Sequence, residues 1–322
     1  MCVDLKGWPR HRLVPHTSNI GMLGRRPGGV GFNVAANLAR LACHPIFLSA
    51  VGDDVDGEYL LAQCVLSGIE TDRVRRVPGA STPVYLAVLD ESGDLAVAVA
   101  AMDLCDGMTP ELLGIDEALR PLPPLVLADA NLPSTTLDYL ARACRQQEVP
   151  LWVEPTTADK CQRLRSCLGS ITFLSPNREE LEILVGRPLP TDADLQAAAR
   201  CLVAEGVTHV FVTLGPRGVL WVSRTDARWH ATASVPVRDV TGAGDAFVSG
   251  AAWAIAQGLP MEEAVECGIA ASLLAIQVVD SVPPTLGPAL LQATRRRFLG
   301  GPCPSAKSDP PAGLTHEGSF HA

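Results

Sequence analysis

The 322-residue sequence lacks the spaced cysteine and histidine pairs from which zinc sites are built. Its ten cysteines are scattered without a Cys-x-x-Cys pair, and its seven histidines include no His-x-x-x-His pair. A zinc site is therefore not expected. Instead we expect most of the cysteines to be buried apolar residues in a reducing compartment.

The sequence also lacks long hydrophobic runs and an excess of positive charge. No apolar run reaches transmembrane length, and residues 1–20 contain no apolar core of signal-peptide length. The formal net charge is −9 and the pI is about 5.3, which argues against nucleic-acid or membrane-surface partners. We expect a cytoplasmic protein that acts on a small molecule.

What the sequence does contain is a regular alternation of two patterns. Short apolar runs of strand character alternate with stretches of helical periodicity. This alternation predicts an α/β fold with a mostly parallel sheet covered by helices on both faces, and ligands at the carboxyl ends of the strands. The strand candidates are 44–52, 124–133, 150–155, 171–177 and 208–215, and the clearest helices are 56–68 and 134–147.

Two segments depart from this alternation. Residues 82–103 have the pattern of two strands joined by a turn at 91–94, which predicts a β-hairpin. The hairpin is a candidate lid or dimer-forming flap, although an ordinary edge hairpin has the same pattern. Residues 300–322 are rich in Pro, Gly and Ser, so we expect a disordered tail.

The segment DVTGAGDAFVSGAAWAI (239–255) places glycines directly before an apolar helix. Glycine leaves backbone N–H groups uncovered, and a helix start favours an anion such as phosphate. Asp245 falls in the first helical turn, beside that anion, which predicts an anion hole with an adjacent base. A helix-capping Asp245 is the simpler alternative.

A second glycine cluster, PGGVGFNVAANLARLA (27–42), precedes a helix expected to start near Asn33. Its glycines allow a ligand to approach the backbone, and the Asn33 amide can both donate to and accept from sugar hydroxyls. A dinucleotide-binding turn is disfavoured, because Val34 stands where the third glycine belongs and residues 18–27 have no strand pattern.

These two segments resemble the amino- and carboxy-terminal signatures of the ribokinase-like (PfkB) carbohydrate kinases. SPNREEL (175–181) resembles the Asn-x-x-Glu motif of that family, and VTLGPRGVLW (212–221) resembles its nucleotide-side strand and turn. The resemblance implies a ribokinase-like three-layer αβα fold with a mainly parallel central sheet and a small β-hairpin lid. It implies a kinase domain over residues 1–299, with ATP and Mg²⁺ as cofactors.

The resemblance also implies catalytic roles. In the family, a substrate hydroxyl attacks the γ-phosphate of ATP. Asp245 matches the base that accepts the hydroxyl proton. The amides of Ala243, Gly244 and Asp245 match the anion hole, and Gly242 shapes its turn.

On the nucleotide side, Asn177 and Glu180 match the motif that positions magnesium and its waters. A helix cap with an i+3 partner is the alternative for this pair, and Arg178 and Arg217 are candidates either for phosphate contacts or for simple solvation. The remaining matches are Thr213, Gly215 and Gly218 at the nucleotide site, and Asp239 and Thr241 at the loop that binds a monovalent cation such as K⁺ in many members.

On the acceptor side, the resemblance places Asp4 with Gly28, Gly29 and Asn33 in the clamp that holds sugar hydroxyls. Several segments look more like pseudouridine kinases than ribokinase, adenosine kinase or fructokinases; they include 28–41, 85–103, LADANLP around Asn131, and 152–160. In that case the 5′-hydroxyl of pseudouridine is the acceptor, and Thr82 is a base-side contact. Another sugar or nucleoside kinase, and a non-catalytic nucleoside-binding isoform, are the alternatives; a hydride-transfer enzyme ranks lower.

The first strand departs from the family pattern. Family members begin with a complete apolar strand before the aspartate, but only three residues precede Asp4 here. We expect a shortened first strand in the main sheet, as in a shortened isoform or an incomplete gene model. Lost strand pairing predicts lower stability and a displaced Asp4.

Overall fold

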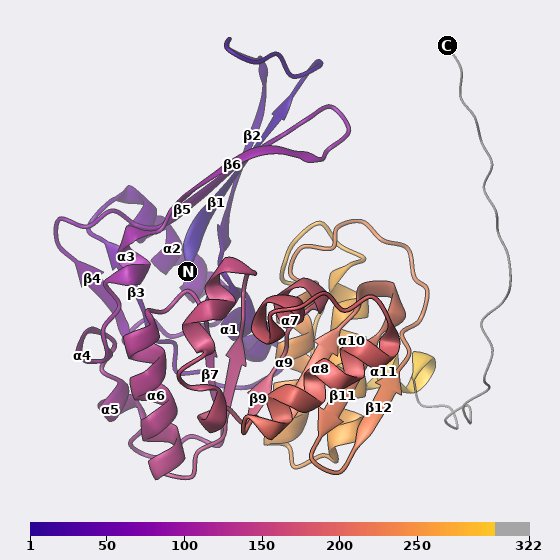
Figure 1. The fold of residues 1–322 in the computed structure, drawn as a ribbon. Coiled ribbons are helices and arrows are strands. Elements are labelled where there is room, and N and C mark those ends of the chain that lie inside the picture. Colours follow the sequence, from indigo (N-terminus) through magenta and orange to yellow (C-terminus); the bar gives the residue numbers. More distant parts are fainter. Residues whose placement is uncertain (300–322) are drawn as a thin grey trace, which may run out of the picture.

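The computed structural model describes residues 1–299, and the predicted disordered tail (300–322) lies outside the described residues. Its centre is a six-stranded sheet in the order β12-β11-β10-β9-β8-β7 (Figure 1). Strands β7 to β10 run parallel, and β11 and β12 are antiparallel at one edge. The strands are β7 (Val126–Asp129), β8 (Leu151–Glu154), β9 (Phe173–Leu174), β10 (His209–Thr213), β11 (Val219–Ser223) and β12 (Ala227–His230).

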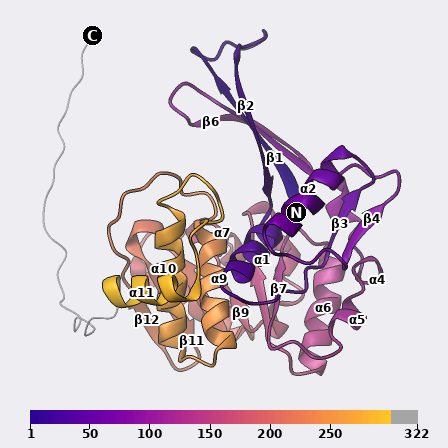
Figure 2. The ribbon, with the colours of Figure 1, turned by 180° about the vertical axis from the view of Figure 1, so that it is seen from behind.

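Helices cover both faces of this sheet, and Figure 2 shows α1, α9, α10 and α11 together on one of them. Among residues 1–299, no helix is long and apolar enough to cross a membrane. The helices are α1 (Val30–Arg40), α2 (Val55–Leu66), α3 (Asp103–Asp106), α4 (Pro110–Leu113), α5 (Ile115–Ala118), α6 (Ser134–Gln146), α7 (Arg178–Val185), α8 (Asp192–Ala204), α9 (Ala243–Ala256), α10 (Met261–Ala275) and α11 (Pro288–Phe298), with short 3₁₀ turns at Asp159–Leu164, Leu168–Ser170 and Gly215–Arg217.

Side chains along the central strands point alternately to the two faces of the sheet, and each face has its own hydrophobic core. Leu151 and Val153 of β8 pack on one side with α6, α7 and α8. Trp152, between them, packs on the other side with α1, α9 and α10. Successive side chains of a strand point to opposite faces, so continuous apolar strands bury both. The predicted three-layer α/β architecture is confirmed.

A second sheet, in the order β2-β1-β5-β6, projects from the body (Figure 1). Its strands are β1 (Cys2–Pro9), β2 (Gly21–Gly28), β5 (Val84–Leu89) and β6 (Leu95–Ala101). The predicted hairpin is therefore present as β5 and β6, paired antiparallel. The prediction that 18–27 forms no strand is wrong, because β2 pairs with β1 along its full length. The segment contains Gly24 and Gly28 and has no apolar–polar alternation, so its sequence pattern does not indicate a strand.

The amino-terminal strand does not lie in the six-stranded sheet. β1 pairs in parallel with β5 and antiparallel with β2. β3 (Ser49–Gly52) and β4 (Val74–Val77) form a separate parallel pair, and β7 is the edge strand of the central sheet. The expectation of a shortened strand in the main sheet stays a prediction.

The packing of α9 against α10 depends on glycine. A Cβ on Gly250 would lie 2.5 Å from the Cys267 carbonyl oxygen, and one on Gly268 would lie 2.6 Å from Cδ2 of Phe247. Close approach of the two backbones holds α9 against the sheet, and α9 begins at the predicted catalytic turn.

We predict that Gly268→Ala destabilises the protein by about 1–3 kcal/mol, because the new methyl group forces Phe247 from its packed position. Denaturant unfolding followed by circular dichroism measures the change. Gly107→Ala is the control, since its Cβ would meet only the Leu104 carbonyl oxygen at 3.4 Å. Equal stability of the two variants would contradict the tight α9–α10 packing.

Candidate active site

A cavity of about 270 Å³ opens where the carboxyl ends of the central strands meet the start of α9. It gathers six residues that the sequence analysis singled out, together with three others. The lining residues are Val30, Glu154, Thr156, Asn177, Glu180, Thr213, Gly242, Gly244 and Asp245.

Gly242 makes the turn that starts α9. Its φ of 80° is left-handed, and a Cβ would lie 2.5 Å from the Ser281 carbonyl oxygen. Only glycine meets both demands without strain. The turn also leaves the start of α9 without a side-chain cap.

Two free amides follow that turn. The Ala243 N–H donates to the Val240 carbonyl at 3.2 Å, so it is already used. The Gly244 and Asp245 amides are in the first helical turn, where N–H groups have no intrahelical partner. Two of the three predicted amides, those of Gly244 and Asp245, are therefore free for a ligand, and their role as an anion hole stays a prediction.

Asp245 lies in the same helical turn as these amides, and its carboxyl group is held by Asn33 of α1. Asn33 Nδ2 donates to Asp245 Oδ2 at 2.7 Å, which joins the two predicted motifs across 212 residues. Burial raises the pKa of Asp245 to about 7; the Asn33 hydrogen bond opposes that rise, and Asp129 and Asp4 add to it. A carboxyl group with a pKa near neutrality suits a general base.

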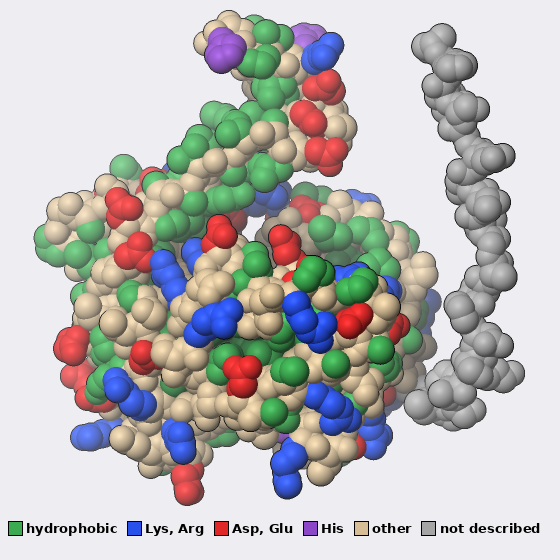
Figure 3. All heavy atoms as spheres, viewed as in Figure 1, with side chains coloured by type: hydrophobic (Ala, Val, Ile, Leu, Met, Phe, Trp, Pro, Cys, Tyr) green, Lys and Arg blue, Asp and Glu red, His purple; other side chains and the backbone are tan. Residues whose placement is uncertain are grey.

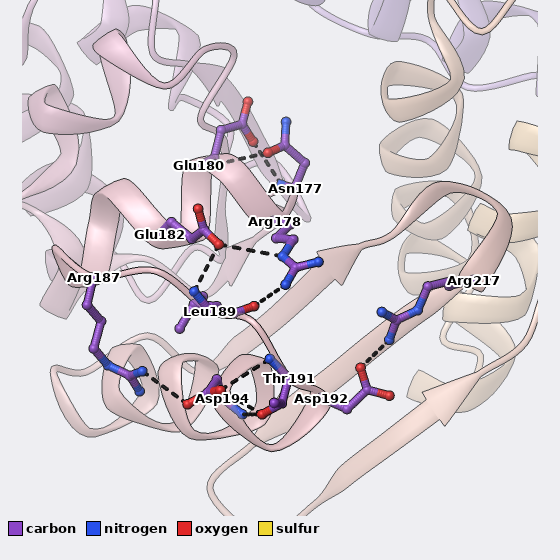
Figure 4. Close-up of polar contacts among 10 residues, drawn as sticks. All are labelled: Asn177, Arg178, Glu180, Glu182, Arg187, Leu189, Thr191, Asp192, Asp194 and Arg217. Carbon is purple, nitrogen blue, oxygen red and sulfur yellow. Dashed lines mark hydrogen bonds and ion pairs between the residues drawn. The ribbon is translucent and has the colours of Figure 1, made fainter. Parts of the chain in front are cut away.

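Asn177 and Glu180 form a reciprocal capping box at the start of α7 (Figure 4). Asn177 Oδ1 accepts from the Glu180 N–H, and Glu180 Oε2 accepts from the Asn177 N–H, both at 2.9 Å. The structure thus contains the helix cap that was the alternative interpretation. Both residues also line the cavity, so capping and ligand binding are compatible.

The two candidate phosphate-binding arginines are engaged elsewhere (Figure 4). Arg178 pairs with Glu182 at 3.5 Å and donates to the Leu189 carbonyl. Arg217 pairs with Asp192. Neither lines the cavity.

The acceptor-side residues lie next to Asp245. A Cβ on Gly28 would overlap the Asp4 carboxyl group, and Asp4 contributes to the raised pKa of Asp245. Gly29 caps α1 with a left-handed φ of 91°. Asn33 contacts Asp245, and Gly28 lies against Asp4, but none of Asp4, Gly28, Gly29 and Asn33 lines the cavity itself.

Asn131 and Thr82, the other two predicted substrate contacts, do not line the cavity. Asn131 Oδ1 accepts a hydrogen bond from Lys160 Nζ. Thr82 is 3% exposed; its hydroxyl donates to Asp54 Oδ1 at 2.6 Å and accepts from the Gly52 N–H. These hydrogen bonds hold the start of α2, and the assignment of Thr82 as a base-side contact stays a prediction.

The other nucleotide-side residues differ in distance from the cavity. Thr213 lines it and bridges to Asn177. Gly215 and Gly218 form the turn between β10 and β11, outside the lining, and Asp239 and Thr241 lie in the loop before Gly242, where the Asp239 carboxylate accepts from the Thr241 N–H at 2.8 Å.

Sequence analysis missed Glu154, Thr156 and Val30. Glu154 ends β8, and the rule that ligands gather at carboxyl ends of strands could have identified it. Burial, with the carboxyl groups of Glu180 and Asp245, raises its pKa well above the usual range, while Ser175 opposes the rise. Thr156 has a left-handed φ of 73°, a strained conformation for a β-branched residue that no sequence pattern indicates.

The donor set can be tested against a magnesium ion. Within residues 1–299, no three His, Cys, Asp or Glu side chains converge to hold a metal by themselves. Magnesium commonly uses one or two carboxylates, waters and substrate phosphates, and Glu154 and Glu180 offer such oxygens to the cavity. The residues therefore fit a magnesium ion that arrives with a phosphate ligand.

Residues 3–285 match the family described as pfkB family carbohydrate kinase. The Escherichia coli (strain K12) pseudouridine kinase is 34% identical over 275 residues, 85% of this chain and 87% of its own. The guanosine-inosine kinase of Exiguobacterium acetylicum is 31% identical over 295 residues, 90% of this chain and 96% of its own. Arabidopsis thaliana ribokinase, solved with ribose and ATP, superposes with a TM-score of 0.79 at 25% identity, covering 92% of this chain and 96% of that one. The chain belongs to the PfkB family of carbohydrate kinases, and its fold is ribokinase-like.

We predict that Asp245→Asn stabilises the protein more at pH 8 than at pH 5. The folded state holds the Asp245 proton with a pKa of about 7, against an ordinary value of 3.8. The stability that this proton provides is complete below 3.8 and is lost as pH rises through 7. The amide does not titrate and avoids that loss.

Melting temperatures measured between pH 5 and pH 8 test this prediction. Exposed Asp72, changed to Asn, is the matched control and should leave the pH dependence unaltered. A difference between Asp245→Asn and the unmodified protein that stays constant with pH would show that Asp245 is not the titrating group.

Proposed function

We propose that this protein is an ATP-dependent kinase that phosphorylates a hydroxyl group of a nucleoside or sugar, with pseudouridine as the leading acceptor. The kinase domain spans residues 1–299. The observation that carries the proposal is the joint position of Asp245, its partner Asn33, and the free amides of Gly244 and Asp245 at one cavity.

In the proposed reaction, Asp245 takes the proton of the acceptor hydroxyl as its oxygen attacks the γ-phosphorus of ATP, and ADP leaves. The Gly244 and Asp245 amides stabilise the charge on the transferring phosphoryl group. Bound magnesium would offset the phosphate charge, with Glu154 and Glu180 facing its water shell. Asn33 keeps the Asp245 carboxyl group in place.

Exposed valines near the start of α9 support the proposal that the base of a nucleotide binds next to the phosphate site. The Arg238 and Asp239 N–H groups donate to the Ile276 carbonyl, which brings the segments around 237–240 and 276–279 together. Three valines on these segments, Val237, Val240 and Val279, are between 52% and 69% exposed. An apolar surface next to a phosphate site suits a planar base. Asp239 and Thr241, in the same loop, remain the proposed residues for a monovalent cation.

The acceptor-side residues support a polyhydroxylated substrate. The lack of a side chain at Gly28 leaves the Asp4 carboxyl group uncovered, and Asn33 Oδ1 is a buried acceptor without a hydrogen-bond partner in the described residues. The match to the Escherichia coli pseudouridine kinase supports pseudouridine, and the match to a guanosine-inosine kinase makes other nucleosides the second candidate. The nine cysteines of the described residues are unpaired, which supports a reducing, cytoplasmic location.

We predict that the protein phosphorylates pseudouridine faster than uridine, guanosine, inosine, adenosine, ribose or fructose when supplied with ATP and magnesium. Coupled ADP release and mass spectrometry of the products measure the kcat/KM ratio for each acceptor. Asp245→Asn should lose roughly 10²–10⁴-fold in kcat, the usual contribution of a general base. Its affinity for ATP should change little.

Three results would decide against parts of this proposal. Preference for another acceptor would replace pseudouridine while keeping the kinase. Nucleoside binding without ADP formation would identify a non-catalytic nucleoside-binding protein. Full turnover by Asp245→Asn would remove the assignment of the base.

We also propose that the projecting sheet serves as a lid and joins two copies of the chain. Its outer face carries Leu86 and Val88 of β5 opposite Val99 and Val97 of β6. Val97 and Val99 are 55% and 59% exposed, and Figure 3 shows hydrophobic side chains gathered along this sheet. An exposed apolar face of this kind indicates a protein–protein contact.

We predict that Val97→Glu converts a dimer into a monomer, because a charge in an apolar contact loses its hydration. Sedimentation velocity at several concentrations measures the mass. Val65→Glu, which changes an exposed valine of α2, should leave the dimer intact. A monomeric unmodified protein would refute the contact.

A further inference from the structure

A chain of two hydrogen bonds links the buried side chains of Trp152 and Ser175 to the half-buried Glu154 at the cavity wall. Trp152 Nε1 donates to Ser175 Oγ at 2.7 Å, and Ser175 Oγ donates to Glu154 Oε2. Trp152 is fully buried and Ser175 is 2% exposed. Glu154, at the end of this chain, lines the cavity.

The direction of the first hydrogen bond is fixed by chemistry. The indole N–H can only donate, so the Ser175 oxygen must accept it. The hydroxyl hydrogen of Ser175 is then free for Glu154, whose Oε2 accepts it when the carboxyl group is ionised. Glu154 is held by one oxygen, and its other oxygen remains for the cavity.

The start of the chain is rigid. The Trp152 ring stacks on Phe211 with centroids 5.2 Å apart and is 5.3 Å from Phe173. It also meets the edge of Phe247 in α9 at 6.4 Å. The packed ring fixes the direction of the indole N–H, and the hydrogen bond from that N–H in turn orients the Ser175 hydroxyl group.

We propose that Ser175, oriented by Trp152, is a positioning residue for phosphoryl transfer: it holds Glu154 at the wall that the metal–nucleotide complex faces. Ser175 touches neither substrate nor metal and acts through Glu154 alone. This role depends on the kinase activity proposed above, and it adds a residue outside the cavity to that machinery.

Ser175→Ala removes the donor to Glu154 and leaves the carboxyl group free to rotate. We expect kcat to fall roughly 10- to 100-fold, the range expected when a group near the reacting atoms moves by about 1 Å. Ser175→Thr keeps the hydroxyl and should restore most of the rate. Ser223→Ala, another buried serine at the far end of β11, is the control and should leave kcat unchanged.

The decisive comparison is a double-mutant cycle with Glu154→Gln. A residue that acts only through Glu154 should have no further effect once Glu154 is changed, so the double variant should match Glu154→Gln. A fall of the same factor in both backgrounds would overturn the positioning role, because it would show that Ser175 acts independently.

A binding measurement separates this role from the proposed activity. Calorimetry with ADP, in the presence and absence of Mg²⁺, gives the factor by which magnesium strengthens binding. We expect Ser175→Ala to reduce that factor and Ser223→Ala to preserve it. An unchanged factor in folded Ser175→Ala would overturn the role of Ser175, whether or not the unmodified protein phosphorylates any acceptor. A protein that phosphorylates none would refute the kinase activity alone.

Discussion

The packing of Trp152 against Phe173 and Phe211 fixes the strands that carry part of the candidate site. These rings come from β8, β9 and β10, and Phe247 adds α9 to the same cluster. Offset-stacked aromatic pairs favour a small set of geometries, so the relative positions of the four elements have little freedom. Glu154, Thr213 and Asp245 each lie within two residues of one of these rings in the sequence.

The site next to this aromatic cluster contains carboxyl groups whose burial lowers the stability of the folded protein when they are ionised. Glu180 is buried, Glu154 and Asp245 are partly buried, and all three carboxyl groups have raised pKa values with desolvation as the first cause. The start of α9 offers partial positive charge, and Asn33 offers one hydrogen bond. Such an arrangement is more stable when a cation and phosphates occupy the cavity, which links the electrostatics of the site to the ligands proposed for it.

Much of this architecture could be predicted from the sequence, because its causes are local. Alternating strands and helices, the two glycine clusters, and the hairpin at 82–103 all follow from periodicity or from the φ angles that glycine permits. Asn177 and Glu180 were predictable for the same reason, since a capping box is an i, i+3 pattern. The contact between Asn33 and Asp245 was not predicted, because nothing local joins residues 212 positions apart.

The rest depends on tertiary contacts. β2 contains Gly24 and Gly28 and no clear alternation, and it becomes a strand by pairing with β1. The Thr82 hydroxyl donates to Asp54, 28 residues away, and no local sequence pattern indicates that contact. Glu154 carries no motif, and its position is defined by Ser175 and the rings beneath it.

The central claim is that phosphoryl transfer takes place at the amino-terminal end of α9. A crystal structure with a non-hydrolysable ATP analogue, magnesium and the acceptor tests it most directly. The account predicts the terminal phosphate against the Gly244 and Asp245 amides, with an acceptor hydroxyl in hydrogen-bond contact with the Asp245 carboxylate. A terminal phosphate bound away from these amides, with Asp245 facing only solvent, would contradict it.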